Sequence, residues 1–210
     1  NKKKNYDVYC LMQFVSFLLS SVAITVTYLV INNLINVWLG ETFVLEPLVT
    51  FAIALNMYFS VVLMPIWSYR EATGMYLQTK YVMVATAVVN LVVSVVLGKT
   101  LGLAGILFAT SIARISTYFW YEPQVLFKQF FGENVWNYYK GIIKNIAVTF
   151  IVAVICALVF QKFVVMSWGG FFIKAVGVSI CASILTIIFY YKDPCFRVIK
   201  SMALGLLKRV

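Results

Sequence analysis

Six long apolar runs constrain this chain more than any other feature of its sequence. They lie at 9–31, 47–67, 81–98, 103–121, 142–161 and 171–191. Each is close to the roughly 20 residues that a helix needs to cross a bilayer core of about 30 Å. Hydrophobic residues make up 63% of the 210 and charged residues only 11%, whereas a soluble domain is about half apolar and about a quarter charged. The sequence therefore predicts an all-α, polytopic membrane protein with six transmembrane helices.

Lysine and arginine are distributed unequally between the two sides of the predicted bundle. Three lie on one side, at Lys99, Lys162 and Lys174. The other side holds Lys2, Lys3, Lys4, Arg70, Lys80, Lys128, Lys140, Lys144, Lys192, Arg197, Lys200, Lys208 and Arg209. Cytoplasmic loops of membrane proteins are enriched in basic residues, so we expect both ends of this segment on the cytoplasmic side.

Composition also argues against several classes of function. Histidine is absent, and the four cysteines show no metal-binding spacing. The acids are expected in loops or at interfaces: Asp7, Glu41, Glu46, Glu71, Glu122, Glu133 and Asp193. The sequence has no Ser/His/Asp set and no phosphate-binding glycine loop. The net charge of +10 is divided among segments between apolar runs, which is unlike a nucleic-acid patch. We therefore predict no catalytic residues, no metal, no cofactor and no nucleic-acid partner.

Several polar residues lie inside the apolar runs. One face of the first run carries Gln13, Ser16, Ser20 and Thr27. Such a stripe either packs against a neighbouring helix or lines a water-filled cavity. Asn56 and Asn90 are single amides near the middle of the second and third runs. Each either bridges two helices or contacts a polar substrate.

Arg114 is the most informative of these residues, because it lies inside the run "AGILFATSIARISTYFWYEP". Its guanidinium keeps its charge, and a central arginine costs about 2.5–3.5 kcal/mol on insertion scales. No acid lies near the centre of any run, and reaching the interface would require passing Tyr118 and Tyr121. We expect Arg114 to face a solvated cavity and an anionic substrate, or a partner from missing chain, with Thr110 and Tyr118 one turn away on the same face.

Two segments are too polar to cross a membrane. Residues 126–145 mix aromatic and lysine side chains, which predicts a short helix lying in the cytoplasmic interface. The tail after Lys192 alternates apolar and basic residues in a similar way. Contact with anionic lipids is the expected role of both segments.

The chain also resembles a known family. The stretch "YREATGMYLQTKYVMVATAVVNLVVSVVLGKTLGLAGILFATSIARISTYFWYEPQVLFKQFF" is similar to the C-terminal half of bacterial O-antigen and capsule repeat-unit flippases. These Wzx-type proteins belong to the multidrug/oligosaccharidyl-lipid/polysaccharide exporter superfamily. The features that carry the resemblance are Arg70 with Gly74, the hairpin Asn90 to Thr110, "WYEPQVLFK" and "NNLINVWLGE". It covers most of residues 30 to 132, and beyond them only the hydropathy matches.

The resemblance implies a transporter of two bundles around a central cleft, about twelve to fourteen helices in all. This chain would supply one bundle: residues 1–132 with four helices and the hairpin, and residues 133–210 with two helices and a basic cytoplasmic tail. Because the sequence begins at Asn1 rather than Met, we expect the other bundle upstream.

The implied activity is the flipping of polyprenyl-pyrophosphate-linked oligosaccharides across the bacterial cytoplasmic (inner) membrane for surface polysaccharide assembly. Membrane lipids and a polysaccharide polymerase or glycosyltransferases are the implied partners. The predicted substrate pathway consists of Arg114, Asn90, Asn56, Gln13, Arg70 and Thr110.

Three alternatives stay open at the level of sequence. A cation-coupled multidrug-type exporter would need an intramembrane acid, which the missing half could hold. A non-transporting subunit of a polysaccharide assembly complex would have a dry interior. A membrane transferase would need a general base, which none of the six runs supplies.

Overall fold

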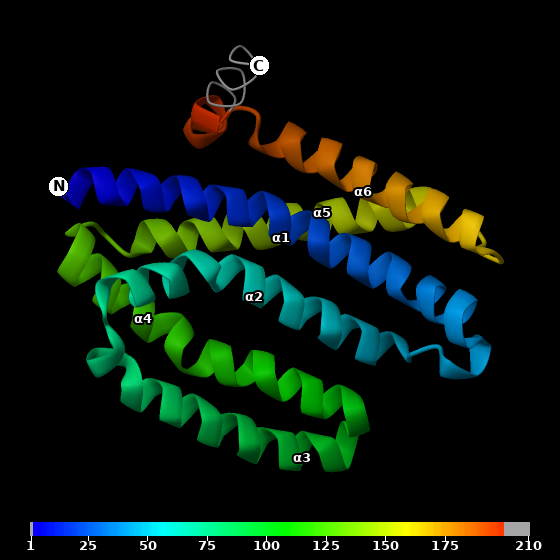
Figure 1. The fold of residues 1–210 in the computed structure, drawn as a ribbon, viewed down its shortest axis with the longest axis horizontal. Coiled ribbons are helices and arrows are strands. Elements are labelled where there is room, and N and C mark those ends of the chain that lie inside the picture. Colours follow the sequence, from blue (N-terminus) through cyan, green and yellow to red (C-terminus); the bar gives the residue numbers. More distant parts are fainter. Residues whose placement is uncertain (1, 200–210) are drawn as a thin grey trace.

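The structure, a computed structural model, describes residues 2–199, and all regular elements in that range are helical. Figure 1 shows the helices lying side by side as an elongated bundle. Its elements are α1 (Lys2–Leu39), the 3₁₀ turn η1 (Glu41–Phe43), α2 (Pro47–Thr73), α3 (Tyr76–Ser116), α4 (Tyr118–Leu126), the π-helical turn η2 (Phe127–Phe131), α5 (Trp136–Phe160) and α6 (Trp168–Tyr190).

Within the described residues, five helices are long and apolar enough to cross a membrane. The third of them, Tyr76–Phe131, turns back on itself at Gly102, whose φ of 58° and ψ of −135° are not helical. Figure 1 shows the two legs of α3 side by side. The six predicted runs therefore occupy six helical legs, and the predicted class, an all-α polytopic membrane protein, is confirmed.

Close backbone approach holds the α3 hairpin together. A Cβ added to Gly105 would meet the backbone oxygen of Leu97 at 2.1 Å, so only glycine fits there. Further along the legs, the amide of Asn90 donates to Thr110 Oγ1 at 3.2 Å. The glycine-containing turn at 98–102, inside the predicted hairpin Asn90 to Thr110, thus brings polar residues of two neighbouring runs together.

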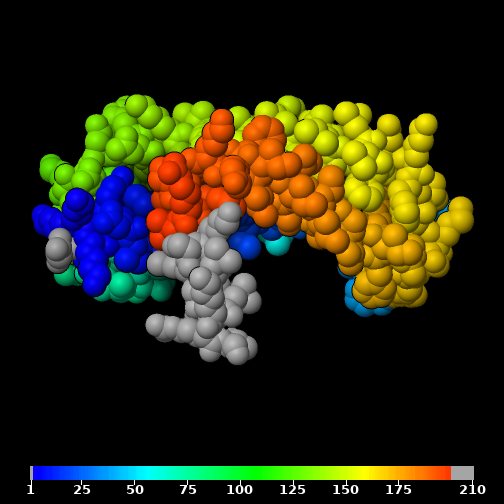
Figure 2. Space-filling model, turned by 90° about the horizontal axis from the view of Figure 1, so that it is seen from above, coloured from blue at the N-terminus to red at the C-terminus, as the bar shows by residue number. Residues whose placement is uncertain are grey.

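Helix α1 lies at the centre of the other helices and contacts α2, α5 and α6. The α3 hairpin instead packs on α2 and continues into α4. Figure 2 shows α6 lying along α5, with residues 191–199 reaching the start of α1. There Phe196 packs against Phe14, with ring centroids 6.5 Å apart. The hairpin is therefore the part of the bundle with the fewest neighbours.

The prediction of one interfacial helix over residues 126–145 is wrong. Gly132, with φ 73°, ends η2 in the left-handed region, and α5 begins at Trp136 and continues without a break into the membrane run. Most aromatic residues of this segment are buried rather than spread on a lipid surface, with Phe127 1% and Tyr138 4% exposed, whereas Trp136 is 62% exposed. Burial in an aromatic core therefore prevails over the interfacial position expected from composition.

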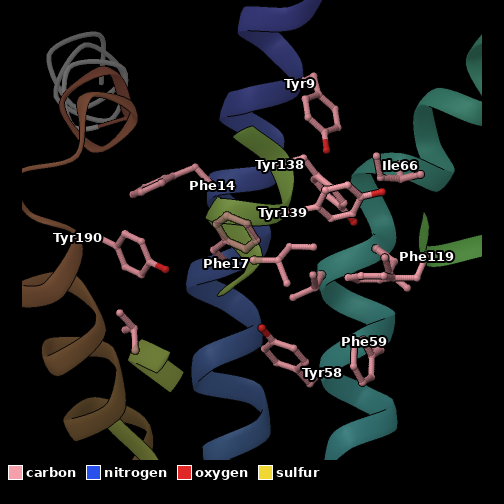
Figure 3. Packing of buried hydrophobic residues seen from close by; sticks show 14 of the residues in the cluster. Tyr9, Phe14, Phe17, Tyr58, Phe59, Ile66, Phe119, Tyr138, Tyr139 and Tyr190 are labelled. Atoms are coloured by element: carbon pink, nitrogen blue, oxygen red, sulfur yellow. The ribbon is translucent and has the colours of Figure 1, made fainter. Parts of the chain in front are cut away.

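That aromatic core lies at one end of the bundle. Figure 3 shows side chains from α1, α2, α5 and α6 meeting there. Ring contacts join Tyr9 to Phe127 at 5.5 Å and Phe14 to Tyr190 at 5.4 Å. The core ties the start of α1 to η2 and to the end of α6.

Most described basic residues lie at this same end, which holds the start of α1, the α2–α3 turn, η2, the start of α5 and the end of α6. Lys99 and Lys162 lie at the opposite end, and Lys174 lies on the second turn of α6. Residues 194–199 of the basic tail are helical, whereas Lys200, Lys208 and Arg209 fall outside the described residues. The cytoplasmic position of both ends stays a prediction.

Candidate functional site

Arg114 lines a groove of about 490 Å³ on the α3 hairpin. The lining residues of the first leg recur at helical spacing, so they share one face of the helix. After the turn, Thr110, Arg114 and Tyr118 follow one another at intervals of four residues, as the sequence predicts for a shared face. The lining consists of Met83, Thr86, Ala87, Asn90, Leu91, Ser94, Thr110, Arg114 and Tyr118. The groove therefore combines one fixed cation with an amide and several hydroxyl groups.

The guanidinium of Arg114 is held from one side only. Its Nη1 donates to Ser60 Oγ at 2.9 Å and to the backbone oxygen of Asn56 at 3.2 Å, both on α2. The indole of Trp67 lies 5.8 Å from the guanidinium carbon. Among residues 2–199, no carboxylate pairs with Arg114. The hydroxyl of Tyr118 also interacts with the guanidinium, so three of its five N–H donors are engaged. Two donor groups of a permanent cation therefore stay available.

Asn90 and Thr110 both line this groove, as their predicted roles require. Their hydrogen bond joins the two legs of the hairpin beside Arg114. Thr86 and Thr117 make a second bridge between the legs, with hydroxyl oxygens 2.6 Å apart. The predicted pathway residues Arg114, Asn90 and Thr110 are thus brought together.

Asn56 belongs to the wall of this region rather than to its surface. Its amide donates to the backbone oxygen of Leu107 at 2.7 Å and accepts from Ser111 Oγ at 2.8 Å. Its backbone oxygen accepts from Ser60 and Arg114. Of the two roles open for this residue, the structure favours bridging α2 to α3.

Gln13 is not part of the groove. It is 5% exposed in the aromatic core, where it donates to the backbone oxygen of Val62 and accepts from Tyr9, each at 3.0 Å. Ser16 and Ser20 are also buried, whereas Thr27 is half-buried and donates to Met57 Sδ. The stripe on α1 therefore packs against neighbouring helices. The structure places Gln13 apart from the groove at Arg114, and its role on a substrate pathway stays a prediction.

Arg70 lies just beyond one end of the groove. Its Nη1 donates to Glu122 Oε1 at 2.8 Å and lies 3.8 Å from the sulfur of Met83, a groove residue. The Glu122 side chain is 1% exposed and that of Arg70 is 12% exposed. Arg70 is therefore a groove neighbour whose charge is balanced by a buried acid.

The burial of Glu122 was missed from the sequence, which placed every acid in a loop or at an interface. Glu122 follows Arg114 by eight residues, so extending that helical face by two turns would have turned it into the bundle. Proline at 123 obscured this signal, because proline usually marks the end of a helix. Here Pro123 lies inside α4.

The sequence also missed a polar centre around Asn145, which is fully buried. Its amide nitrogen donates to Phe17 O, Ser21 Oγ and Tyr190 Oη, each at 3.1 Å. Its Oδ1 accepts from Tyr58 at 2.7 Å and from Ser20 at 3.3 Å. Figure 3 shows Tyr58 and Tyr190 pointing toward the same region beside α1. The four-residue spacing of Asn145 and Thr149 was the available signal.

A second groove of about 390 Å³ runs between α1, α2 and α5. Its lining is nearly all apolar: Ile24, Tyr28, Phe51, Leu55, Tyr58, Phe59, Ile146, Thr149, Phe150, Ala153, Val154 and Ala157. Such a surface suits a hydrocarbon chain or an apolar helix face. It differs in chemistry from the groove at Arg114.

Nothing in the described part of the chain forms a metal site, since residues 2–199 contain no group of three or more His, Cys, Asp or Glu that could hold an ion. In comparisons with known proteins, the chain matches no protein-family model, no curated protein and no solved structure. The flippase resemblance therefore rests on the sequence motifs alone. The chain is a polytopic helical membrane protein with a mainly apolar groove that also carries Arg114, Asn90 and several hydroxyl groups.

Proposed function

We propose that this chain forms one bundle of a transporter that flips polyprenyl-linked oligosaccharides across a bacterial cytoplasmic membrane. In this proposal the groove at Arg114 receives the charged head group of the substrate. The partner bundle faces the hairpin and closes the substrate pathway. Alternating access requires this partner, because it moves one bundle against another.

The proposal rests on the guanidinium of Arg114, which uses only part of its hydrogen-bonding capacity in the described structure. A cation inside a membrane bundle is costly unless its environment is polar or it meets an anion. Arg114 has hydroxyl and amide neighbours, no carboxylate partner among residues 2–199, and donor groups left over on a groove surface. A phosphate or an acidic sugar supplies the missing acceptors, and the planar fork of arginine suits both.

The groove also addresses the main energetic obstacle to flipping. A sugar phosphate that entered hydrocarbon would lose its water without replacement, at a cost of several kcal/mol per unpaired polar group. The groove offers Asn90, Thr110 and Ser94 as substitutes for that water along the two legs. The polyprenyl tail needs no such groups and stays in lipid.

A cation-coupled exporter is a second candidate, favoured by one observation. Glu122 is a buried carboxylate, of the kind that such an exporter uses for ion coupling. It is already paired with Arg70, however, and an acid with a fixed cationic partner is a poor site for a second cation. The flippase proposal therefore fits the charges better.

The proposal is tested in a bacterial host that depends on the full-length parent protein for surface polysaccharide. Arg114→Ala and Arg114→Lys are compared with wild type at matched membrane levels. The measured quantities are surface polysaccharide and lipid-linked repeat units retained in the cytoplasmic leaflet. We expect Arg114→Ala to lower export about tenfold or more and to trap the precursor, with Arg114→Lys in between, because lysine keeps the charge but not the fork.

Lys174→Ala is the matched control for this experiment. Lys174 is also a partly buried cation in a membrane helix without an acidic partner among residues 2–199, and its Nζ donates to Asn33 Oδ1 at 2.9 Å. It lies on α6, away from the groove. Normal export in Arg114→Ala, or equal losses in Arg114→Ala and Lys174→Ala, would contradict the proposal.

A further inference from the structure

The junction of α2, α4 and α5 contains three buried polar atoms without a partner in the described structure: Arg70 Nε, Glu122 Oε2 and Tyr138 Oη. Buried polar atoms are normally hydrogen-bonded, and each exception calls for an explanation. These three atoms come from helices that meet at the end of the groove. Arg70 contacts Glu122 directly, and the ring of Tyr138 packs against Phe119, three residues before Glu122. This neighbourhood allows two arrangements of partners.

The first arrangement is the one that the structure contains. Arg70 and Glu122 are joined by a single hydrogen bond, from Nη1 to Oε1 at 2.8 Å. Strong arginine–carboxylate pairs are commonly bidentate, which this one is not. Glu71 lies 3.9 Å from Arg70 Nη2, but its side chain is 61% exposed and its attraction is screened. Arg70 is therefore held by one short contact.

The second arrangement is available to Glu122 through Tyr138. The tyrosine ring packs against Phe119 at 6.4 Å and Phe127 at 6.1 Å between centroids, and these residues flank Glu122 along the chain. A phenol hydroxyl is a donor that a displaced carboxylate can use.

We propose that Arg70 is a second anion-binding group of the groove and that Glu122 is its displaceable counter-ion. A phosphate group that reaches the groove end beside Met83 binds the guanidinium of Arg70 in place of Glu122. The hydroxyl of Tyr138 then donates a hydrogen bond to the released carboxylate of Glu122. No covalent bond changes in this exchange. It deepens and rests on the proposed function, since it places a phosphate-recognition step between the basic end of the bundle and Arg114.

The exchange has a clear energetic logic. A buried carboxylate that loses its only cation without replacement is strongly disfavoured. Tyr138 lowers that penalty but does not remove it, so Glu122 competes with the ligand for Arg70. Removing the charge of Glu122 should then tighten anion binding, and removing the hydroxyl of Tyr138 should weaken it.

The test uses the purified chain in nanodiscs, with inorganic pyrophosphate as the soluble probe and phosphatidic acid in the nanodisc as the lipid probe. Dissociation constants are measured for wild type, Glu122→Gln, Tyr138→Phe and the double variant. We expect Glu122→Gln to bind about tenfold more tightly and Tyr138→Phe about threefold more weakly. Tyr138→Phe should not change the affinity in the Glu122→Gln background, because no carboxylate remains to accept a hydrogen bond from the tyrosine hydroxyl.

Two controls make the outcome specific. Glu71→Gln removes an acid beside the same arginine without touching the buried pair, so its affinity should stay within about twofold of wild type. The double variant Arg70→Gln, Glu122→Gln should lose the gain in anion affinity that Glu122→Gln alone produces. Melting temperatures of all variants are measured. If Glu122→Gln does not fold, the affinity of Arg70→Lys, which keeps the positive charge, is measured in its place.

The proposal is overturned if Glu122→Gln binds both probes no more tightly than wild type, or if Tyr138→Phe weakens binding equally in both backgrounds. Tighter binding of phosphatidic acid alone identifies a lipid head group as the ligand, and tighter binding of both probes identifies phosphate in general. This outcome is separable from the export test. Normal export in Arg114→Ala with tighter binding in Glu122→Gln removes the proposed function and leaves the anion site.

Discussion

The two polar regions of this bundle differ in how completely their hydrogen bonds are satisfied. Asn145 is fully buried, and both atoms of its amide bond to groups on α1, α2 or α6. Arg114 is half-buried on a groove, and its contacts to Ser60, Asn56 and Tyr118 leave N–H donors of the guanidinium without a partner within residues 2–199. Polar groups with all partners present hold helices together, whereas polar groups with donors left over are available to a ligand.

The neighbourhoods of the two regions agree with this distinction. Asn145 lies where α1, α2, α5 and α6 meet, and a ring of aromatic side chains surrounds that meeting point. Arg114 lies on the hairpin that packs on α2 alone among the long helices described. A rigid four-helix body and a peripheral arm are therefore combined in one chain. Such a division suits a bundle whose arm faces a moving partner.

The largest expected effect comes from breaking the satisfied region. Asn145→Ala removes five hydrogen-bond contacts and leaves buried hydroxyl groups without partners, so we expect a loss of about 3 kcal/mol in unfolding free energy. Asn90→Ala removes a single hydrogen bond on the groove, to Thr110, and should cost less than about 1 kcal/mol. Unfolding in mixed micelles measures both. Equal losses would erase the distinction between the two regions.

A smaller effect should follow from opening the hairpin that carries the groove. Gly105→Ala places a methyl group against the backbone of Leu97, which cannot give way, and should destabilise the hairpin by about 2 kcal/mol. Gly98→Ala is its control, because the added Cβ meets only the flexible side chain of Ile106, at 3.1 Å. Hydrogen exchange of the two legs reports the result. Faster exchange in Gly98→Ala than in Gly105→Ala would contradict the packing described here.

The fold was more accessible from the sequence than the site, for a physical reason. A membrane helix must satisfy its backbone internally, so an apolar run of sufficient length specifies the element directly. The turn at Gly102 was similarly local, since glycine adopts the required φ without strain. No such local rule states which helix a polar side chain will meet.

Arg114, Asn90 and Thr110 were predictable because their runs are adjacent in the chain and joined by a short turn. Gln13 and Asn145 depend instead on contacts with residues 45 to 128 positions away, which periodicity does not encode. Glu122 shows a third kind of error. Its partner, Arg70, lies 52 positions away, and a buried acid is recognisable only once that partner is known.

The most direct test of the account compares two threonines in a cysteine-free background. Thr110→Cys lies on the groove, and Thr25→Cys lies in the satisfied region, where Thr25 is fully buried and donates to the backbone oxygen of Ser21. A charged methanethiosulfonate reagent is applied to the protein in nanodiscs, and the rate of modification is measured at both positions. The account predicts that Thr110→Cys reacts at least about tenfold faster, because a buried site reacts only after local opening. Equal rates, or faster reaction at Thr25→Cys, would show that the groove at Arg114 is not the solvated face of this bundle.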